Sequence, residues 1–168
     1  MLVVAFITAV CFSGNYIVSN ISLPRIFYYN DTASLPRGLY MKAFTDSPVK
    51  RGDYVIFRPN EETIKIALER GYIASQETLF LKKVGGIAGD RYYINPFNRH
   101  FTINNQYIGE VCKTDSKNRE LPQLSGYYDI PDGHFLPVGV NPRSFDGRYT
   151  KTVPIANIVC KVVPILTE

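Results

Sequence analysis

Short runs of β-branched and aromatic residues, separated by turn residues, recur along the chain beyond residue 30. Such runs are typical of strands, because these side chains pack well on a pleated surface. The clearest runs occupy residues 54–57, 78–81, 91–94 and 101–103. Turn residues at 95–98 and 104–105 predict hairpin connections, and the triplet at 131–133 precedes another apolar run. The pattern predicts an irregular, mainly β domain.

Residues 61–71, EETIKIALERG, depart from this pattern. Ile64, Ala67 and Leu68 recur at helical spacing, acidic residues begin the segment and a glycine ends it. We therefore expect a short helix inserted between strands. The polar, turn-rich stretch at 113–123 is expected to be an exposed loop.

The chain begins with an apolar segment that carries no charged side chain before Arg25. Its unbroken apolar run at residues 2–12 is shorter than the roughly 20 residues that span a bilayer. Together with the less hydrophobic residues up to Ile21, the segment is long enough to span one. Neither a basic start nor a clear small-x-small cleavage site is evident. Residues 1–22 are therefore predicted to be a membrane anchor or a signal segment that is not cleaved. A cleaved signal and a buried core helix remain as alternatives, and all but the last imply export.

Composition and charge narrow the classes of protein. A chain of 168 residues with 45% hydrophobic content fits one domain with a real core. The 19 basic residues are scattered among 15 acidic ones and give a net charge of +4, which is only a weak argument for binding to nucleic acid or to an anionic membrane surface. No nucleic-acid partner is expected.

The cysteines and histidines leave one question open. Cys112 and Cys160 could form a disulfide in an exported domain, or remain two unconnected thiols. Their spacing fits no metal site, because there is no C-x-x-C and the two histidines stand alone. No metal and no cofactor is expected.

Candidate chemistry begins at Ser34, within TASLPRGLY at residues 32–40. A serine before a proline-containing stretch is either a turn residue or a nucleophile, and a nucleophile needs a base that takes its proton. His134 could complete a triad with Ser34 and an aspartate, but it lies between a turn and an apolar strand, where a strand-end histidine is the ordinary interpretation. His100, beside the hairpin turn at 95–98, is no stronger a candidate.

A lysine base is the better alternative. Lys82 and Lys83 follow the apolar run at 79–81, and strand alternation turns one of them toward the side where Phe80 points. A lysine against nonpolar surface loses solvation, so its pKa falls and its neutral amine can accept a proton near neutral pH.

Four segments carry a resemblance to a known family. They are SLPRGLY at 34–40, PVKRGDYV at 48–55, FLKKVGGIAGD at 80–90 and IPDGHFLPVGVNPRSFDGRY at 130–149. In this order they resemble the boxes of the signal peptidase I superfamily of serine-lysine peptidases, family S26, and in particular its TraF-like conjugative transfer peptidases. The chain departs from general signal peptidases at Ala88, where proline is usual, and at 139–141, where the aspartate after glycine is missing and the box is one residue short.

The resemblance implies a signal-peptidase-like antiparallel β fold with a short inserted helix and an N-terminal hydrophobic helix, in which residues 30–168 form a periplasmic serine peptidase domain. It places Ser34 as the nucleophile and Lys82 as the general base. It also assigns the oxyanion donors to the backbone N–H of Ser34 and the hydroxyl of Thr32, with a plain strand-end threonine as the alternative.

In the last segment the resemblance gives Ser144 the role of orienting the lysine amine. Asp146 and Arg148 are expected to form an ion pair that shapes this segment. One alternative is that the two residues belong to an ordinary solvated turn. Another is that Asp146 lies nearer the lysine and influences catalysis directly.

The function implied is that of a membrane-associated serine endopeptidase that processes exported precursors after small side chains. A conjugative pilin precursor is the expected client, released as an acid or cyclised onto its own amino terminus. The expected location is a bacterial inner membrane with the catalytic domain in the periplasm, in contact with conjugation machinery, or the periplasm itself if the signal is cleaved. A general signal peptidase and a catalytically silent β module of a secretion or pilus assembly are the rival hypotheses. A self-cleaving repressor is disfavoured, because no DNA-binding helical domain is evident.

Overall fold

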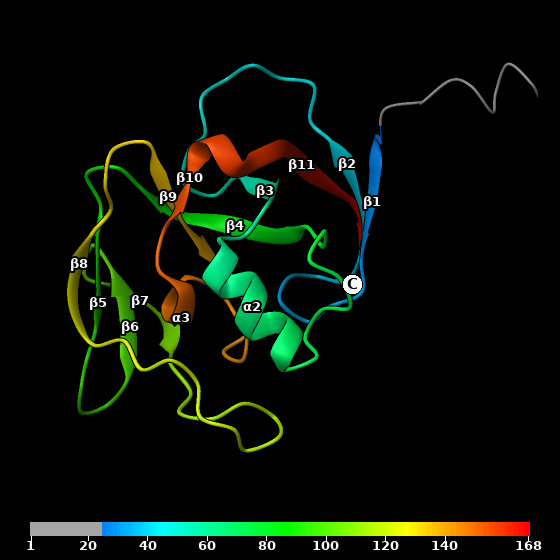
Figure 1. The fold of residues 1–168 in the computed structure, drawn as a ribbon. Coiled ribbons are helices and arrows are strands. Elements are labelled where there is room, and N and C mark those ends of the chain that lie inside the picture. The colour runs from blue at the N-terminus through cyan, green and yellow to red at the C-terminus, as the bar shows by residue number, and fades with distance from the viewer. Residues whose placement is uncertain (1–24) are drawn as a thin grey trace, which may run out of the picture.

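The computed structural model describes residues 25–168, so the predicted segment at residues 1–22 lies outside the described residues. Its strands form two antiparallel sheets (Figure 1), with seven strands in the order β1-β2-β11-β3-β4-β9-β10 and four in the order β7-β6-β5-β8. The strands are β1 (Phe27–Asn30), β2 (Gly38–Lys42), β3 (Tyr54–Phe57), β4 (Phe80–Ile87), β5 (Arg91–Ile94), β6 (His100–Ile103), β7 (Gln106–Glu110), β8 (Gly126–Asp129), β9 (His134–Val138), β10 (Val153–Pro154) and β11 (Ile158–Thr167). The helices are α2 (Glu61–Glu69), α3 (Gly147–Thr150) and the 3-10 turn η1 (Ile155–Asn157). The mainly antiparallel β fold expected from the sequence is confirmed.

The hydrophobic core consists of three clusters of buried side chains. Val55, Phe57 and Phe135 pack on one face of the larger sheet, where the Phe57 and Phe135 rings meet edge to face at 5.2 Å. Tyr40 and Ile56 belong to a separate buried cluster. The third cluster joins the smaller sheet to β9 and α3 and consists of Tyr92, Ile94, Phe101, Ile103, Val111, Leu121, Ile130, Leu136, Val138 and Tyr149. Buried side chains of β3, β4 and β9 therefore anchor these three strands in the core.

Strand β4 is longer than the pattern predicts, because it continues through both lysines and two glycines to Ile87. Burial alternates along it, with Lys82 and Val84 buried on one face, up to a bulge between Val84 and Gly86. Antiparallel pairing with β3 and β9 keeps this stretch extended despite its low intrinsic strand propensity. Lys82 therefore lies in the interior of β4, not beyond the end of the predicted strand at 78–81.

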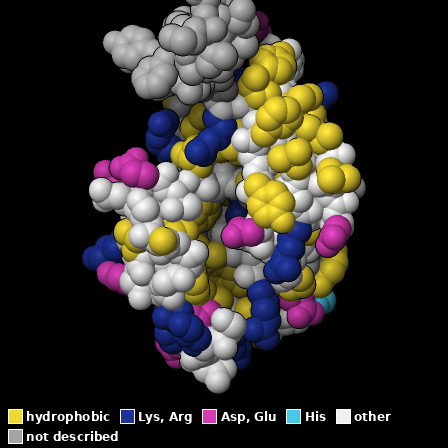
Figure 2. All heavy atoms as spheres, turned by 90° about the vertical axis from the view of Figure 1, so that its right-hand side faces the viewer, with side chains coloured by type: hydrophobic (Ala, Val, Ile, Leu, Met, Phe, Trp, Pro, Cys, Tyr) yellow, Lys and Arg dark blue, Asp and Glu magenta, His cyan; other side chains and the backbone are white. Residues whose placement is uncertain are grey.

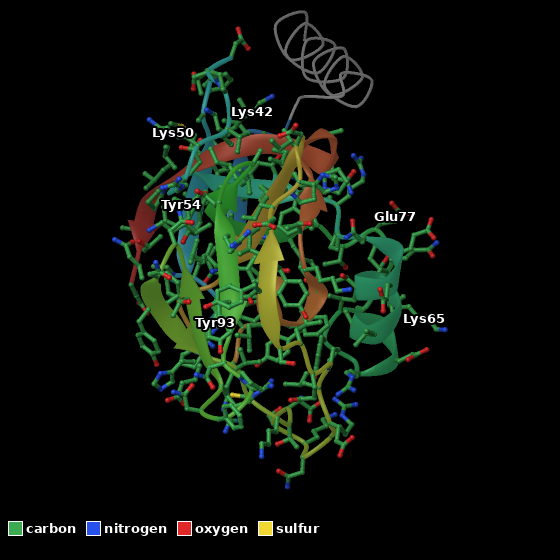
Figure 3. The ribbon with its side chains drawn as sticks, turned by 90° about the vertical axis from the view of Figure 1, so that its left-hand side faces the viewer. Lys42, Lys50, Tyr54, Lys65, Glu77 and Tyr93 are labelled. Carbon is green, nitrogen blue, oxygen red and sulfur yellow. The ribbon has the colours of Figure 1, made fainter. Side chains whose placement is uncertain are left out.

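The predicted helix is confirmed as α2, between β3 and β4. Its buried residues are Thr63 and Ala67, whereas Leu68 is exposed, so the buried face is rotated from the expected one. Lys65 points away from the body of the molecule (Figure 3). Within the described residues no helix is long and apolar enough to cross a bilayer.

Both predicted hairpin turns are confirmed. The turn at 95–98 joins β5 to β6, and Asn104–Asn105 joins β6 to β7 with φ values of 49° and 66°. Asparagine tolerates this left-handed conformation, which tight hairpins require. The predicted loop at 113–123 contains one isolated bridge, between Thr114 and Glu120. It is anchored rather than loose, because Asp115, only 6% exposed at its side chain, pairs with basic residues.

Candidate active site

Lys82 is a buried amine in the middle of β4. Only 5% of the residue is exposed, and Nζ donates a hydrogen bond of 2.9 Å to Oγ of Ser144. The side chain lies on the same side of the strand as Phe80, whose ring centroid is 6.0 Å from Nζ. Burial is the main cause that lowers the Lys82 pKa from 10.5 to about 8; the charge of Asp146 acts in the opposite direction and that of Arg148 adds to the lowering. About a tenth of this amine is therefore neutral at pH 7, far more than for an ordinary lysine.

Ser34 lies in the turn between β1 and β2 and is half-buried. It lines the same cleft of about 850 Å³ as Lys82 and Thr32. Its backbone carbonyl accepts a hydrogen bond of 2.8 Å from the Val140 amide. The amine of Lys82 is hydrogen-bonded to Ser144 and not to the Ser34 hydroxyl. Without substrate, hydrogen bonds between catalytic groups are often long or poorly aligned and tighten only when substrate binds.

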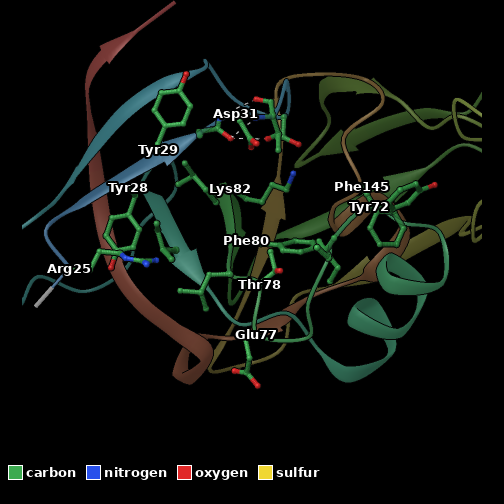
Figure 4. Close-up of a pocket in the computed structure, with 18 of the residues that line it drawn as sticks. Arg25, Tyr28, Tyr29, Asp31, Tyr72, Glu77, Thr78, Phe80, Lys82 and Phe145 are labelled. Atoms are coloured by element: carbon green, nitrogen blue, oxygen red, sulfur yellow. Dashed lines mark hydrogen bonds between the residues drawn. The ribbon is translucent and has the colours of Figure 1, made fainter. Parts of the chain in front are cut away.

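The cleft runs past the lysine, from Arg25 and Tyr28 at one end to Tyr72 and Phe145 at the other (Figure 4). The Tyr72 and Phe145 rings meet at 5.3 Å and form a firm apolar wall. Figure 2 shows hydrophobic side chains gathered on the face that carries β1 and the end of β11. The exposed members of this face are Phe27, Tyr29, Val163, Ile165 and Leu166.

Asp146 and Arg148 form a buried ion pair rather than a solvated turn. Nη2 of Arg148 lies 2.7 Å from Oδ2 of Asp146, and the two side chains are 2% and 0% exposed. The guanidinium also donates to the carbonyls of Gly139 and Asn141, while Asp146 accepts from the Gly139 amide at 2.7 Å. The pair thus holds the segment that follows β9, and Ser144 with it.

Gly139 lies where this segment passes close to both Ser34 and Ser144. A Cβ at this position would lie 2.2 Å from Oγ of Ser144 and 2.7 Å from the carbonyl of Ser34. Only a residue without a side chain allows the segment after β9 to pass between these two groups. The structure therefore brings Ser34, Lys82 and Ser144 together around one cleft.

Thr32 lines the cleft, but its hydroxyl donates a hydrogen bond of 2.8 Å to Oδ1 of Asn30. The sequence pattern does not mark Asn30 as a site residue. The available signal is its position two residues before Thr32, because asparagine side chains commonly bond to the backbone two residues on.

The other candidates lie elsewhere. His134 begins β9, where Nδ1 is 3.1 Å from the Asp132 carbonyl, and it does not line the cleft. His100 faces Glu110 at 3.9 Å.

Cys112 and Cys160 are free thiols, so the disulfide alternative is wrong. Among residues 25–168 no group of histidine, cysteine and carboxylate side chains could hold a metal ion.

A family model and a similar protein identify the family of this chain. The family model described as signal peptidase, peptidase S26, matches residues 1–167. A plasmid transfer protein TraF of Escherichia coli is 32% identical over 148 residues, which cover 82% of this chain and 81% of that protein. A second TraF of Escherichia coli is 28% identical over 146 residues, with the same coverage of 82% and 81%. A crystal structure of a signal peptidase I from Enterococcus faecalis V583 is 19% identical, with a TM-score of 0.44, and covers 71% of this chain and 100% of its own. The chain belongs to the signal peptidase family, peptidase S26.

Proposed function

We propose that this protein is a membrane-associated serine endopeptidase in which Ser34 and Lys82 act as a catalytic dyad. One observation carries the proposal: a lysine with a pKa of about 8 is buried at the cleft that Ser34 also lines, with its amine hydrogen-bonded to Ser144. A structural lysine in a strand gains nothing from such burial, because desolvation disfavours its charged form. A general base gains the neutral state that it needs.

In the proposed mechanism Oγ of Ser34 attacks the scissile carbonyl while neutral Lys82 accepts the hydroxyl proton. The tetrahedral oxyanion receives hydrogen bonds from the Ser34 amide and from the Thr32 hydroxyl. Protonated Lys82 then donates to the departing amine, which leaves an acyl-enzyme on Ser34. Lys82 next takes a proton from water, which attacks the ester and releases the acid. Ser144 keeps the amine in place throughout.

An extended peptide has a free strand edge to pair with in this cleft. Strand β9 pairs with β4 only from Lys83 onward, whereas β3 occupies the opposite edge from Phe80. On the side of β4 that faces away from β3, the backbone groups of Phe80–Lys82 form no backbone hydrogen bond with any described residue. A substrate strand on this edge would bring its scissile bond to the end that carries Lys82.

The client we propose is the precursor of a conjugative pilin, because two of the relatives are plasmid transfer proteins. In this proposal residues 1–22 anchor the chain in the inner membrane, or direct its export, and residues 30–168 act in the periplasm beside the conjugation machinery. If the amino terminus of the substrate replaces water as the acceptor, the product is a cyclic pilin.

The test is co-expression of the full chain with its cognate pilin precursor, followed by mass spectrometry. The wild-type protein should process the precursor, whereas Ser34→Ala and Lys82→Ala should not. Lys83→Ala is the matched control, since the neighbouring lysine points to the other side of β4 and should be dispensable. Processing by either dyad variant would refute the mechanism. A product lighter by one water than the linear form identifies cyclisation, and rescue of cells depleted of their own signal peptidase identifies the general enzyme instead.

A further inference from the structure

Asn30, the last residue of β1, has a buried polar side chain whose hydrogen bonds, among residues 25–168, all go to the turn that carries Ser34. We call residues 32–36 the nucleophile turn. Only 6% of Asn30 is exposed, and Nδ2 lies 3.0 to 3.1 Å from the carbonyls of Thr32, Leu35 and Pro36. Oδ1 accepts from the Thr32 amide at 3.2 Å and from the Thr32 hydroxyl at 2.8 Å. One side chain thus bonds to the turn on both sides of Ser34.

The geometry of the nucleophile turn depends on this amide. Three carbonyl oxygens converge on one nitrogen, and without its protons they would repel each other in a partly buried site. Of the three, the Pro36 carbonyl also accepts a hydrogen bond of 2.8 Å from the Tyr40 hydroxyl. The Ser34 carbonyl is held separately, by the Val140 amide at 2.8 Å. Asn30 therefore fixes the turn from within, and the segment after β9 fixes it from the other side.

Asn30 also controls the hydroxyl of Thr32. A hydroxyl has one proton, and that of Thr32 is directed to Oδ1 of Asn30. To donate to an oxyanion the hydroxyl must rotate, after which Oδ1 still accepts from the Thr32 amide. The resting bond holds the Thr32 side chain in place beside the cleft until charge develops on the substrate.

We infer that Asn30 is a positioning residue, which holds the nucleophile turn so that Ser34 presents its hydroxyl to the cleft and Thr32 stays within reach of the oxyanion. The inference rests on the proposed function. Asn30 acts through Ser34 and Thr32 and not through the base, because none of its hydrogen bonds involves Lys82 or Ser144.

The test measures hydrolysis of the p-nitrophenyl ester of N-acetylalanine, whose small acyl group suits the proposed site, by the full chain and its Asn30 variants. Asn30→Ala removes all five hydrogen bonds, and Asn30→Asp keeps the acceptor and the shape but removes the amide protons. Both should lower kcat by about 100-fold, because misplacing the attacking atom by about 1 Å costs that much. KM should stay within about threefold, since ground-state binding is not touched. The pH dependence should keep its inflection at about 8, set by Lys82.

Two controls separate positioning from general stability. Asn157→Ala removes an amide that also donates to a carbonyl, that of Arg58 at 3.1 Å, and should leave kcat unchanged. Val153→Ala weakens the core at β10, the edge of the larger sheet opposite β1, and provides a destabilised protein with an intact turn. In an Asn30→Ala/Thr32→Val double variant the losses should be less than additive, since both changes break the same bond.

The outcomes distinguish this inference from the function it rests on. If the wild-type protein hydrolyses the ester only when Ser34 and Lys82 are present, and a folded Asn30→Ala or Asn30→Asp keeps its kcat within about threefold, the inference alone fails. The inference also fails if Val153→Ala has the same melting temperature as the Asn30 variants and loses as much kcat as they do. If the wild-type activity does not require Ser34, both the proposed function and the role of Asn30 are overturned. Should Asn30→Ala not fold, Asn30→Ser decides, because it places no charge beside the three carbonyl oxygens and cannot satisfy all of them.

Discussion

Replacing Lys82 with methionine should abolish activity and yet make the protein more stable at neutral pH. The wild-type chain buries an amine whose folded-state pKa is about 8, compared with 10.5 for an ordinary lysine. Below about pH 8 both the folded and the unfolded chain carry the charged amine, so the full cost of burying it is present. Methionine has a similar length and no charge to desolvate.

The size of the effect follows from the two pKa values. Their difference corresponds to about 3 kcal/mol, because each pKa unit is worth about 1.4 kcal/mol. The lost hydrogen bond to Ser144 offsets about 1 kcal/mol of this, which leaves a gain of about 2 kcal/mol below pH 8. Between about pH 8 and 10.5 the unfolded lysine binds a proton that the folded one does not, so wild-type stability rises with pH. The advantage of Lys82→Met should therefore fall by about 3 kcal/mol across this window, from a gain of about 2 kcal/mol to a deficit of about 1 kcal/mol.

The assay is urea unfolding of both proteins at pH 6, 7, 8, 9 and 10, with the difference in unfolding free energy plotted against pH. Taking the difference removes the titration of tyrosines and other groups that both proteins share. Lys83→Met provides the control for an unspecific effect of removing a charge from β4. A difference that does not change between pH 7 and 10, or that grows, would show that Lys82 keeps an ordinary pKa and would refute the reasoning on the base.

Three further predictions concern the site. The kcat/KM for a peptide substrate should rise about tenfold per pH unit and level off near pH 8 as Lys82 loses its proton; an inflection near pH 6.5 would instead indicate a histidine base. Gly139→Ala places a Cβ 2.2 Å from the hydroxyl of Ser144 and should lower kcat by at least about 100-fold, so wild-type kcat in this variant would contradict the close approach. Asp146→Asn leaves a guanidinium with a 2% exposed side chain without its carboxylate and should lower the unfolding free energy by about 3 to 5 kcal/mol in urea; a loss below about 1 kcal/mol would show that the pair is solvated.

Local pattern determined much of the secondary structure from the sequence alone. The helix at 61–69, the hairpin turns at 95–98 and 104–105 and the strand after residue 133 follow from spacing and turn chemistry, which act over a few residues. Ordered boxes also sufficed to recognise the family and to choose Lys82 over Lys83 as the candidate base. The inferences on secondary structure succeed because each depends on residues that are close together in the chain.

The properties that would make the site work come from contacts between distant segments. Lys82 lies in the interior of β4 because β3 and β9 pair with it, and its amine is buried beside Ser144, which is 62 residues away. Asp146 and Arg148 are only two residues apart, but whether their pair is solvated or buried depends on the segments packed over it. The amide of Asn30 has a role only once the nucleophile turn has folded around it. Local sequence therefore determined which residues could carry the chemistry, whereas burial, and with it the lowered pKa of Lys82, was decided by the tertiary structure, because desolvation depends on everything that surrounds a group.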